Sequence, residues 1–125
     1  MLRLLFRLAA LGAVIATAIH VAALSLPAFA AANYPAEYPA WRHLLFIAID
    51  SALAALFLTR PAWFVWAFAV LTVQVCYGHG GHAWASWQRS GSIAWLDAVA
   101  LAGVSLALGL LIVDYRGRSR VGWQA

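Results

Sequence analysis

The chain has 125 residues, of which 66% are hydrophobic and only 10% charged, and its net charge of +4 comes entirely from arginine. Soluble domains have far more charged residues, so much of the apolar surface must face lipid. The length fits a single domain, residues 1–125, with at most about four spans of ~20 residues. The single cysteine excludes an internal disulfide.

The first apolar run, residues 8–26, follows two arginines and allows two interpretations. The small residues at 27–31 fit a signal-peptide cleavage site. However, the run is longer than the ~7–15 residues of a signal peptide's apolar region, and it contains His20. These features favour a first transmembrane helix, and whether residues 1–30 are removed in the cell stays open.

Three further helices are predicted, at residues 42–59, 62–78 and 93–113. Two prolines make residues 31–40 a loop, and Arg60-Pro61 forms a tight turn before the third helix. The glycines of Gly78–Gly81 are expected to end that helix, and residues 83–90 form a loop or a short interfacial helix. The prediction is an all-α integral membrane protein, an antiparallel bundle of four transmembrane helices.

The arginines predict the orientation of this bundle. Six of them fall on one side of the predicted membrane, namely Arg3, Arg7, Arg60, Arg116, Arg118 and Arg120. Because positive charge favours the cytoplasmic side, both termini are predicted to be cytoplasmic. The expected location is the inner (cytoplasmic) membrane, as a multi-pass protein whose surroundings are the lipid bilayer. Since the cations mark helix ends, they do not indicate nucleic-acid binding.

Histidines and aspartates gather in the half of the predicted bundle that faces away from the cytoplasm. At a rise of about 1.5 Å per residue, His20 and Asp50 lie roughly 12–14 Å deep, with Gln74 less deep. A shallower tier lies about one turn or less below the boundary and comprises His43, His79, His82 and Asp97. Ionisable side chains are costly in hydrocarbon, so they are expected to face the bundle interior and one another.

The shallow tier predicts a metal site, because imidazoles and a carboxylate suit zinc, copper or iron. The proposed ligands are His43, His79, His82 and Asp97. The deep tier (His20, Asp50 and Gln74) would form a second shell or a proton path. Haem is the second choice of cofactor, since His43 and His79 lie at equal depth. Cys76 is either a small core residue or a soft metal ligand.

Each of these features also has a purely structural interpretation. The shallow histidines suit a membrane boundary, His20 and Asp50 suit a buried hydrogen bond, and Asp97 suits the positive end of a helix dipole. No sequence motif identifies an enzymatic reaction. The leading hypothesis is a small inner-membrane protein that uses the His/Asp site for metal handling or redox work. The alternatives are a non-catalytic accessory or assembly subunit of a larger membrane complex, and a proton- or ion-conducting homo-oligomer.

Overall fold

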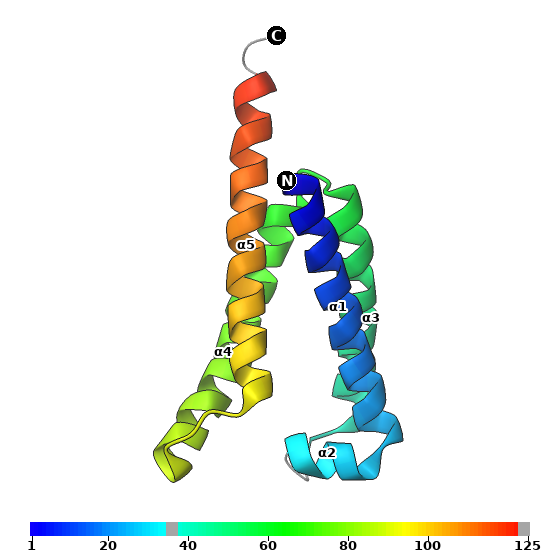
Figure 1. The fold of residues 1–125 in the computed structure, drawn as a ribbon, viewed down its shortest axis with the longest axis vertical. Helices are drawn as coiled ribbons and strands as arrows, with labels where there is room; N and C mark the ends of the chain where they lie inside the picture. The colour runs from blue at the N-terminus through cyan, green and yellow to red at the C-terminus, as the bar shows by residue number, and fades with distance from the viewer. Residues whose placement is uncertain (35–37, 123–125) are drawn as a thin grey trace. The chain divides into compact units, whose positions relative to one another are not determined.

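The computed structural model describes residues 1–34 and 38–122, so part of the predicted loop at residues 31–40 lies outside the described residues. The described residues are helical and contain no strand. The helices are α1 (Leu2–Ser25), α2 (Pro27–Asn33), α3 (Ala40–Thr59), α4 (Phe64–Ser90) and α5 (Trp95–Gly122), as labelled in Figure 1. They fall into two compact units, Met1–Arg60 and Pro61–Ala125, here called unit 1 and unit 2.

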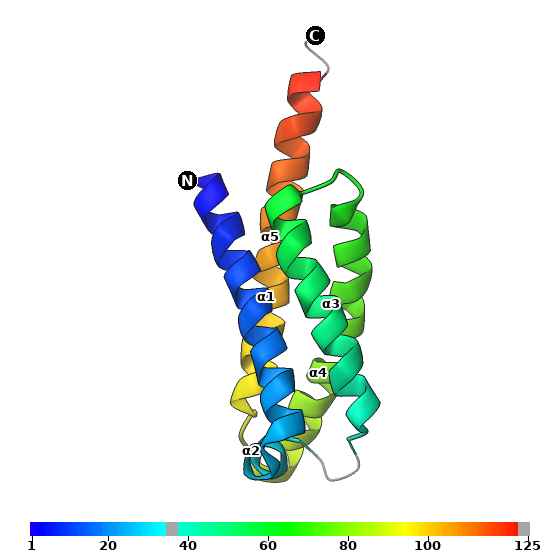
Figure 2. The same cartoon turned by 90° about the vertical axis from the view of Figure 1, so that its right-hand side faces the viewer.

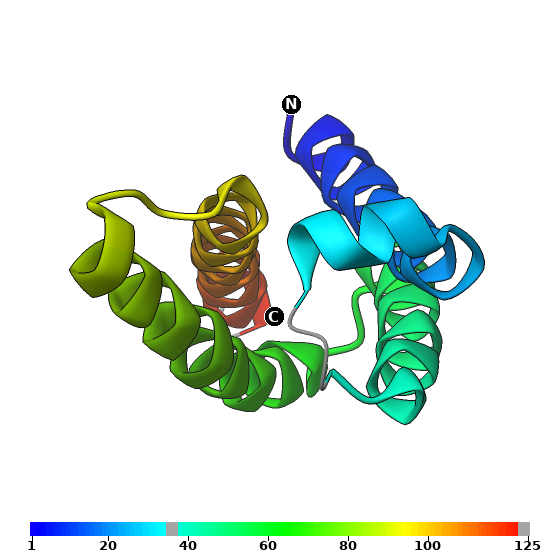
Figure 3. The ribbon, with the colours of Figure 1, turned by 90° about the horizontal axis from the view of Figure 1, so that it is seen from below.

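Unit 1 is an antiparallel hairpin in which α1 and α3 lie side by side (Figure 2). Near one end, the ring of Phe6 packs 6.5 Å from that of Phe57, and the guanidinium of Arg60 lies 5.0 Å from the Phe6 ring centroid. At the other end, the backbone turns extended at Leu26 and Pro27 begins α2. This short helix, absent from the prediction, runs crosswise to α1 (Figures 1 and 3).

Unit 2 is a second antiparallel hairpin, formed by α4 and α5. At one end Trp66 packs edge-to-face on Tyr115, with ring centroids 6.0 Å apart. At the other end His79 and His82 of α4 reach Asp97 in the first turn of α5. The helix predicted to end at residue 113 instead continues to Gly122 as α5.

The glycines of Gly78–Gly81 do not end a helix as predicted, because α4 continues without interruption to Ser90. The predicted interfacial helix at residues 83–90 is therefore the last part of α4. A glycine in a helix interior costs only about 1 kcal/mol, and the bonds to Asp97 hold this stretch against α5. The helix ends at Gly91, whose left-handed φ of 68° suits glycine.

Replacing Gly91 with alanine is expected to lower the free energy of unfolding by about 1 kcal/mol, because a Cβ disfavours left-handed backbone. Gly103 is the matched control. It lies inside α5, where an added Cβ would meet nothing within 4 Å. Gly103→Ala should therefore stabilise by about 0.5 kcal/mol through helix propensity. Thermal unfolding followed by circular dichroism in detergent measures both, and equal shifts would contradict this assignment of the helix end.

Among the described residues, three helices are long and apolar enough to cross a membrane: Leu2–Ser25, Ala40–Thr59 and the Trp95–Ser119 part of α5. Their outward surface is also apolar, as Leu106 illustrates with 75% exposure. Helix α4 is not among the three, although Val70 and Val73 are 73% and 71% exposed. The three helices therefore have the length and composition of membrane spans, with apolar surface on the side that would face lipid.

Candidate histidine–aspartate sites

In unit 2, one carboxylate bridges two imidazoles. Nδ1 of His79 lies 2.8 Å from Oδ1 of Asp97, and Nδ1 of His82 lies 2.6 Å from Oδ2. The two histidines are three residues apart on α4, so they share one helix face. We call His79, His82 and Asp97 the unit 2 triad.

The bonding of the unit 2 triad determines which imidazole nitrogens remain for a ligand. An ionised carboxylate only accepts hydrogen bonds, so both imidazoles donate to Asp97 through Nδ1–H. In the neutral ring this leaves Nε2 with a lone pair. The carboxylate of Asp97 is 6% exposed, whereas the imidazoles of His79 and His82 are 37% and 41% exposed. The arrangement therefore has a buried anchor and two accessible imidazoles.

Unit 1 holds a second set of ionisable groups, His20, His43 and Asp50, which we call the unit 1 triad. The Nδ1 atoms of His20 and His43 are 3.0 Å apart, so one donates to the other. On the other side of the His20 ring, Nε2 lies 4.0 Å from Oδ2 of Asp50. His43 is 4% exposed, and the side chains of His20 and Asp50 are 15% and 14% exposed.

Aromatic rings surround the unit 1 triad. Tyr34, which follows α2, packs edge-on against His43 at 4.7 Å between centroids, and the Tyr38 ring lies 4.8 Å from the same imidazole. Phe46 stacks on His20 at 5.2 Å with an interplanar angle of 13°. Partial burial raises the pKa of Tyr38, and the guanidinium of Arg42, 5.6 Å from the ring centroid, opposes that rise.

The structure therefore groups the residues of the two predicted tiers differently. His43, predicted in the shallow tier, is level with His20, because α1 ends at Ser25 and His20 is only five residues from that end. Gln74, predicted beneath the site, and Cys76, predicted as a small core residue or a soft metal ligand, are both exposed in the structure. Sequence reasoning missed the two tyrosines and Phe46 as partners of the histidines, although Phe46 is one helical turn from His43.

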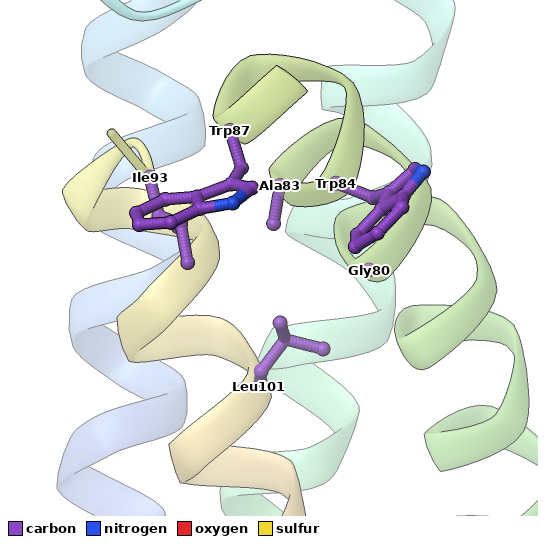
Figure 4. A pocket seen from close by; sticks show the side chains of 6 residues that line it. All are labelled: Gly80, Ala83, Trp84, Trp87, Ile93 and Leu101. Atoms are coloured by element: carbon purple, nitrogen blue, oxygen red, sulfur yellow. The ribbon is translucent and has the colours of Figure 1, made fainter. Parts of the chain in front are cut away.

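An apolar pocket of about 420 Å³ lies in unit 2 between the end of α4 and the start of α5. Figure 4 shows its lining, with the rings of Trp84 and Trp87 and the side chain of Leu101 around the opening. Gly80, Ala83 and Ile93 complete it. Two of the lining residues, Gly80 and Ala83, directly follow His79 and His82 of the unit 2 triad in the sequence.

Within residues 1–34 and 38–122, no three His, Cys, Asp or Glu side chains are arranged to hold one metal ion together. The unit 2 triad explains why: the oxygens of Asp97 lie at hydrogen-bond distance from the Nδ1 atoms, which leaves no room for an ion between them. Comparison with protein-family models, curated proteins and solved structures gave no match.

Proposed function

We propose that this chain is a membrane protein that binds a transition-metal ion through the Nε2 atoms of His79 and His82. The observation that carries the proposal is the pair of hydrogen bonds from the two Nδ1 atoms to the buried carboxylate of Asp97. Histidine ligands of metals commonly donate their other ring N–H to a carboxylate, which sets the tautomer and orients the ring. In the proposed site Asp97 is this orienting group, a role distinct from that of a ligand.

The donor set of the proposed site suits zinc, copper or iron, which imidazole nitrogen binds well. Two protein ligands leave the remaining coordination positions to water or to a molecule that brings or takes the ion. Such an incomplete site favours reversible metal handling over a permanent structural role. His43 is not included in the ligand set, because its Nδ1 is bonded to His20 in unit 1. Haem remains the second choice of cofactor.

The proposal includes a fourth membrane crossing by α4. Contacts between α4 and α5 run from the Trp66–Tyr115 pair to the His82–Asp97 bond. Residues 66–82 of α4 therefore accompany the crossing part of α5 for about 24 Å at ~1.5 Å per residue. A helix beside a spanning helix crosses the same hydrocarbon. With the arginine-rich helix ends on the cytoplasmic side of the inner membrane, the unit 2 triad opens on the opposite side.

Metal content of the purified protein is the direct test. The detergent-solubilised protein is incubated with Zn²⁺ or Cu²⁺ and desalted. It is expected to retain about one equivalent of the metal ion. The variants His79→Ala and His82→Ala should lose most of this metal. Cys76→Ser and His43→Ala are the controls and should keep the metal. Circular dichroism checks that every variant is folded.

Other outcomes of this experiment would redirect the assignment. Loss of metal in His43→Ala would place that residue in the ligand set, and a haem absorption band would make haem the cofactor. A metal-free, folded protein that copurifies with a larger membrane complex would contradict metal binding and favour an accessory subunit.

A further inference from the structure

We propose that the unit 1 triad is a proton relay that carries a proton between the membrane boundary and a reservoir at Asp50. The three side chains come from both helices of the hairpin and form one continuous line. His43 contacts His20 through Nδ1 at 3.0 Å, and Nε2 on the far side of the same His20 ring faces Asp50 at 4.0 Å. This activity is separate from metal binding, since it uses none of the residues of the unit 2 triad.

The bond between the two imidazoles requires a proton that both rings can hold. An Nδ1···Nδ1 distance of 3.0 Å is a hydrogen bond, and only one of two facing nitrogens can donate. Either histidine can be that donor, because a ring nitrogen is a donor or an acceptor according to its tautomer. The proton therefore needs only a short displacement to change rings.

Transfer along the line balances without any further reactant. With His43 doubly protonated, its Nδ1–H bond breaks and an Nδ1–H bond forms on His20. The Nε2–H bond of His20 then breaks, and an O–H bond forms on the carboxylate of Asp50. The step from His20 to Asp50 spans 4.0 Å, which is too long for a direct hydrogen bond and fits a small side-chain rotation or one bridging water.

The outer end of the line is His43, which lies near the end of the hairpin against the rings of Tyr34 and Tyr38. His43 is the fourth residue of α3, whereas Asp50 is seven residues further along that helix, about 10 Å deeper. Among the described residues of unit 1, the titratable and charged groups around His43 are Tyr34, Tyr38 and Arg42. Phe46 stacks on His20 and holds that ring in the line.

The line stops at Asp50, which makes that carboxylate a reservoir within unit 1. Beyond it, α3 has no ionisable side chain before Arg60, and α1 has none between His20 and Arg7. Ionisable residues placed inside membrane-spanning helices commonly serve as proton relays. Asp50 would therefore be loaded and unloaded from the side on which His43 lies.

Time-resolved infrared spectroscopy of the full chain in lipid nanodiscs tests the relay. The carboxylic-acid C=O band of Asp50 is assigned by its loss in Asp50→Asn. In the native protein the intensity of this band should rise quickly after a light-induced drop in pH. In His43→Phe, which keeps an aromatic ring at the buried position, its rise should be roughly a hundredfold slower. His82→Phe is the matched control and should keep the native rate.

A structural hydrogen bond without transfer gives different results. Equal rates in the native protein and in His43→Phe would overturn the relay, as would the absence of a titrating Asp50 band. If His43→Phe does not fold, ¹⁵N NMR of the native histidines replaces it. The relay then requires His20 and His43 to titrate as a coupled pair, and independent titration curves would overturn it. Metal content is unaffected by these measurements, so either proposal can fail alone.

Discussion

Alanine in place of Asp97 is expected to lower the metal affinity of the protein by about 10–100-fold, although the proposed ligand atoms are untouched. The carboxylate bonds the Nδ1 atoms of both His79 and His82, at 2.8 and 2.6 Å. Without this carboxylate the two rings rotate and change tautomer, so their Nε2 lone pairs are no longer held in position to bind a metal ion. Competition between the protein and a coloured zinc chelator measures the change.

The matched control for this prediction is Asp114→Ala. Asp114 is also a buried aspartate of α5, 5% exposed, and it is ion-paired with Arg118 at 2.6 Å near the far end of the helix. Its replacement removes a buried charge without touching the proposed site, so zinc affinity should stay unchanged. Equal losses of zinc affinity in both variants would show that the effect is general destabilisation. Unchanged zinc affinity in Asp97→Ala would show that Asp97 does not orient the histidines.

Alanine in place of Phe6 is expected to destabilise the α1–α3 hairpin by about 2–3 kcal/mol. The ring is 2% exposed and packs on Phe57 and beneath the guanidinium of Arg60. Lipid tails are as apolar as the protein interior, so the loss comes from missing contacts and from the cavity. The free energy of unfolding in mixed micelles, titrated with a denaturing detergent, gives the value.

Leu4→Ala is the control for Phe6→Ala. Leu4 is on the same helix, near Phe6, but is 58% exposed. Its side chain contacts lipid, and lipid fills the space that the truncation leaves, so the free energy of unfolding should change little. A comparable loss in both variants would show that Phe6 does not anchor α1 on α3.

Hydrophobic pattern and the cost of isolated charge account for most of what could be predicted from the sequence. The all-helical architecture and the membrane-spanning potential of three helices follow from long apolar runs. The prediction that His20 lies near Asp50, and that His79 and His82 lie near Asp97, follows from the need of such groups for partners. The full set of four ligands, with His43 among them, stays a prediction.

The errors came from positions where tertiary contacts outweigh local preference. Glycines favour helix ends, yet Gly78–Gly81 remain helical because α5 holds the flanking histidines. The depth of His20 was overestimated: α1 ends at Ser25, within one residue of the predicted end, so His20 lies only about 8 Å from that end and level with His43. Sequence offsets alone also could not show that both oxygens of Asp97 are engaged by Nδ1 atoms.

The two helices of unit 2 are offset along their axes, and this offset has a consequence for the depth of the unit in the proposed membrane orientation. Tyr115 is level with Trp66 near the start of α4. Residues 116–122 of α5 extend about 10 Å beyond that level, and residues 64–65 of α4 only about 3 Å, so α5 projects roughly 7 Å past the start of α4. In the proposed membrane orientation, this end of α5 places Arg116 and Arg118 at the height of the lipid phosphates. In that orientation, moving unit 2 deeper would bring these guanidinium groups into the hydrocarbon, which is costly, so the two arginines would limit the depth of the whole unit.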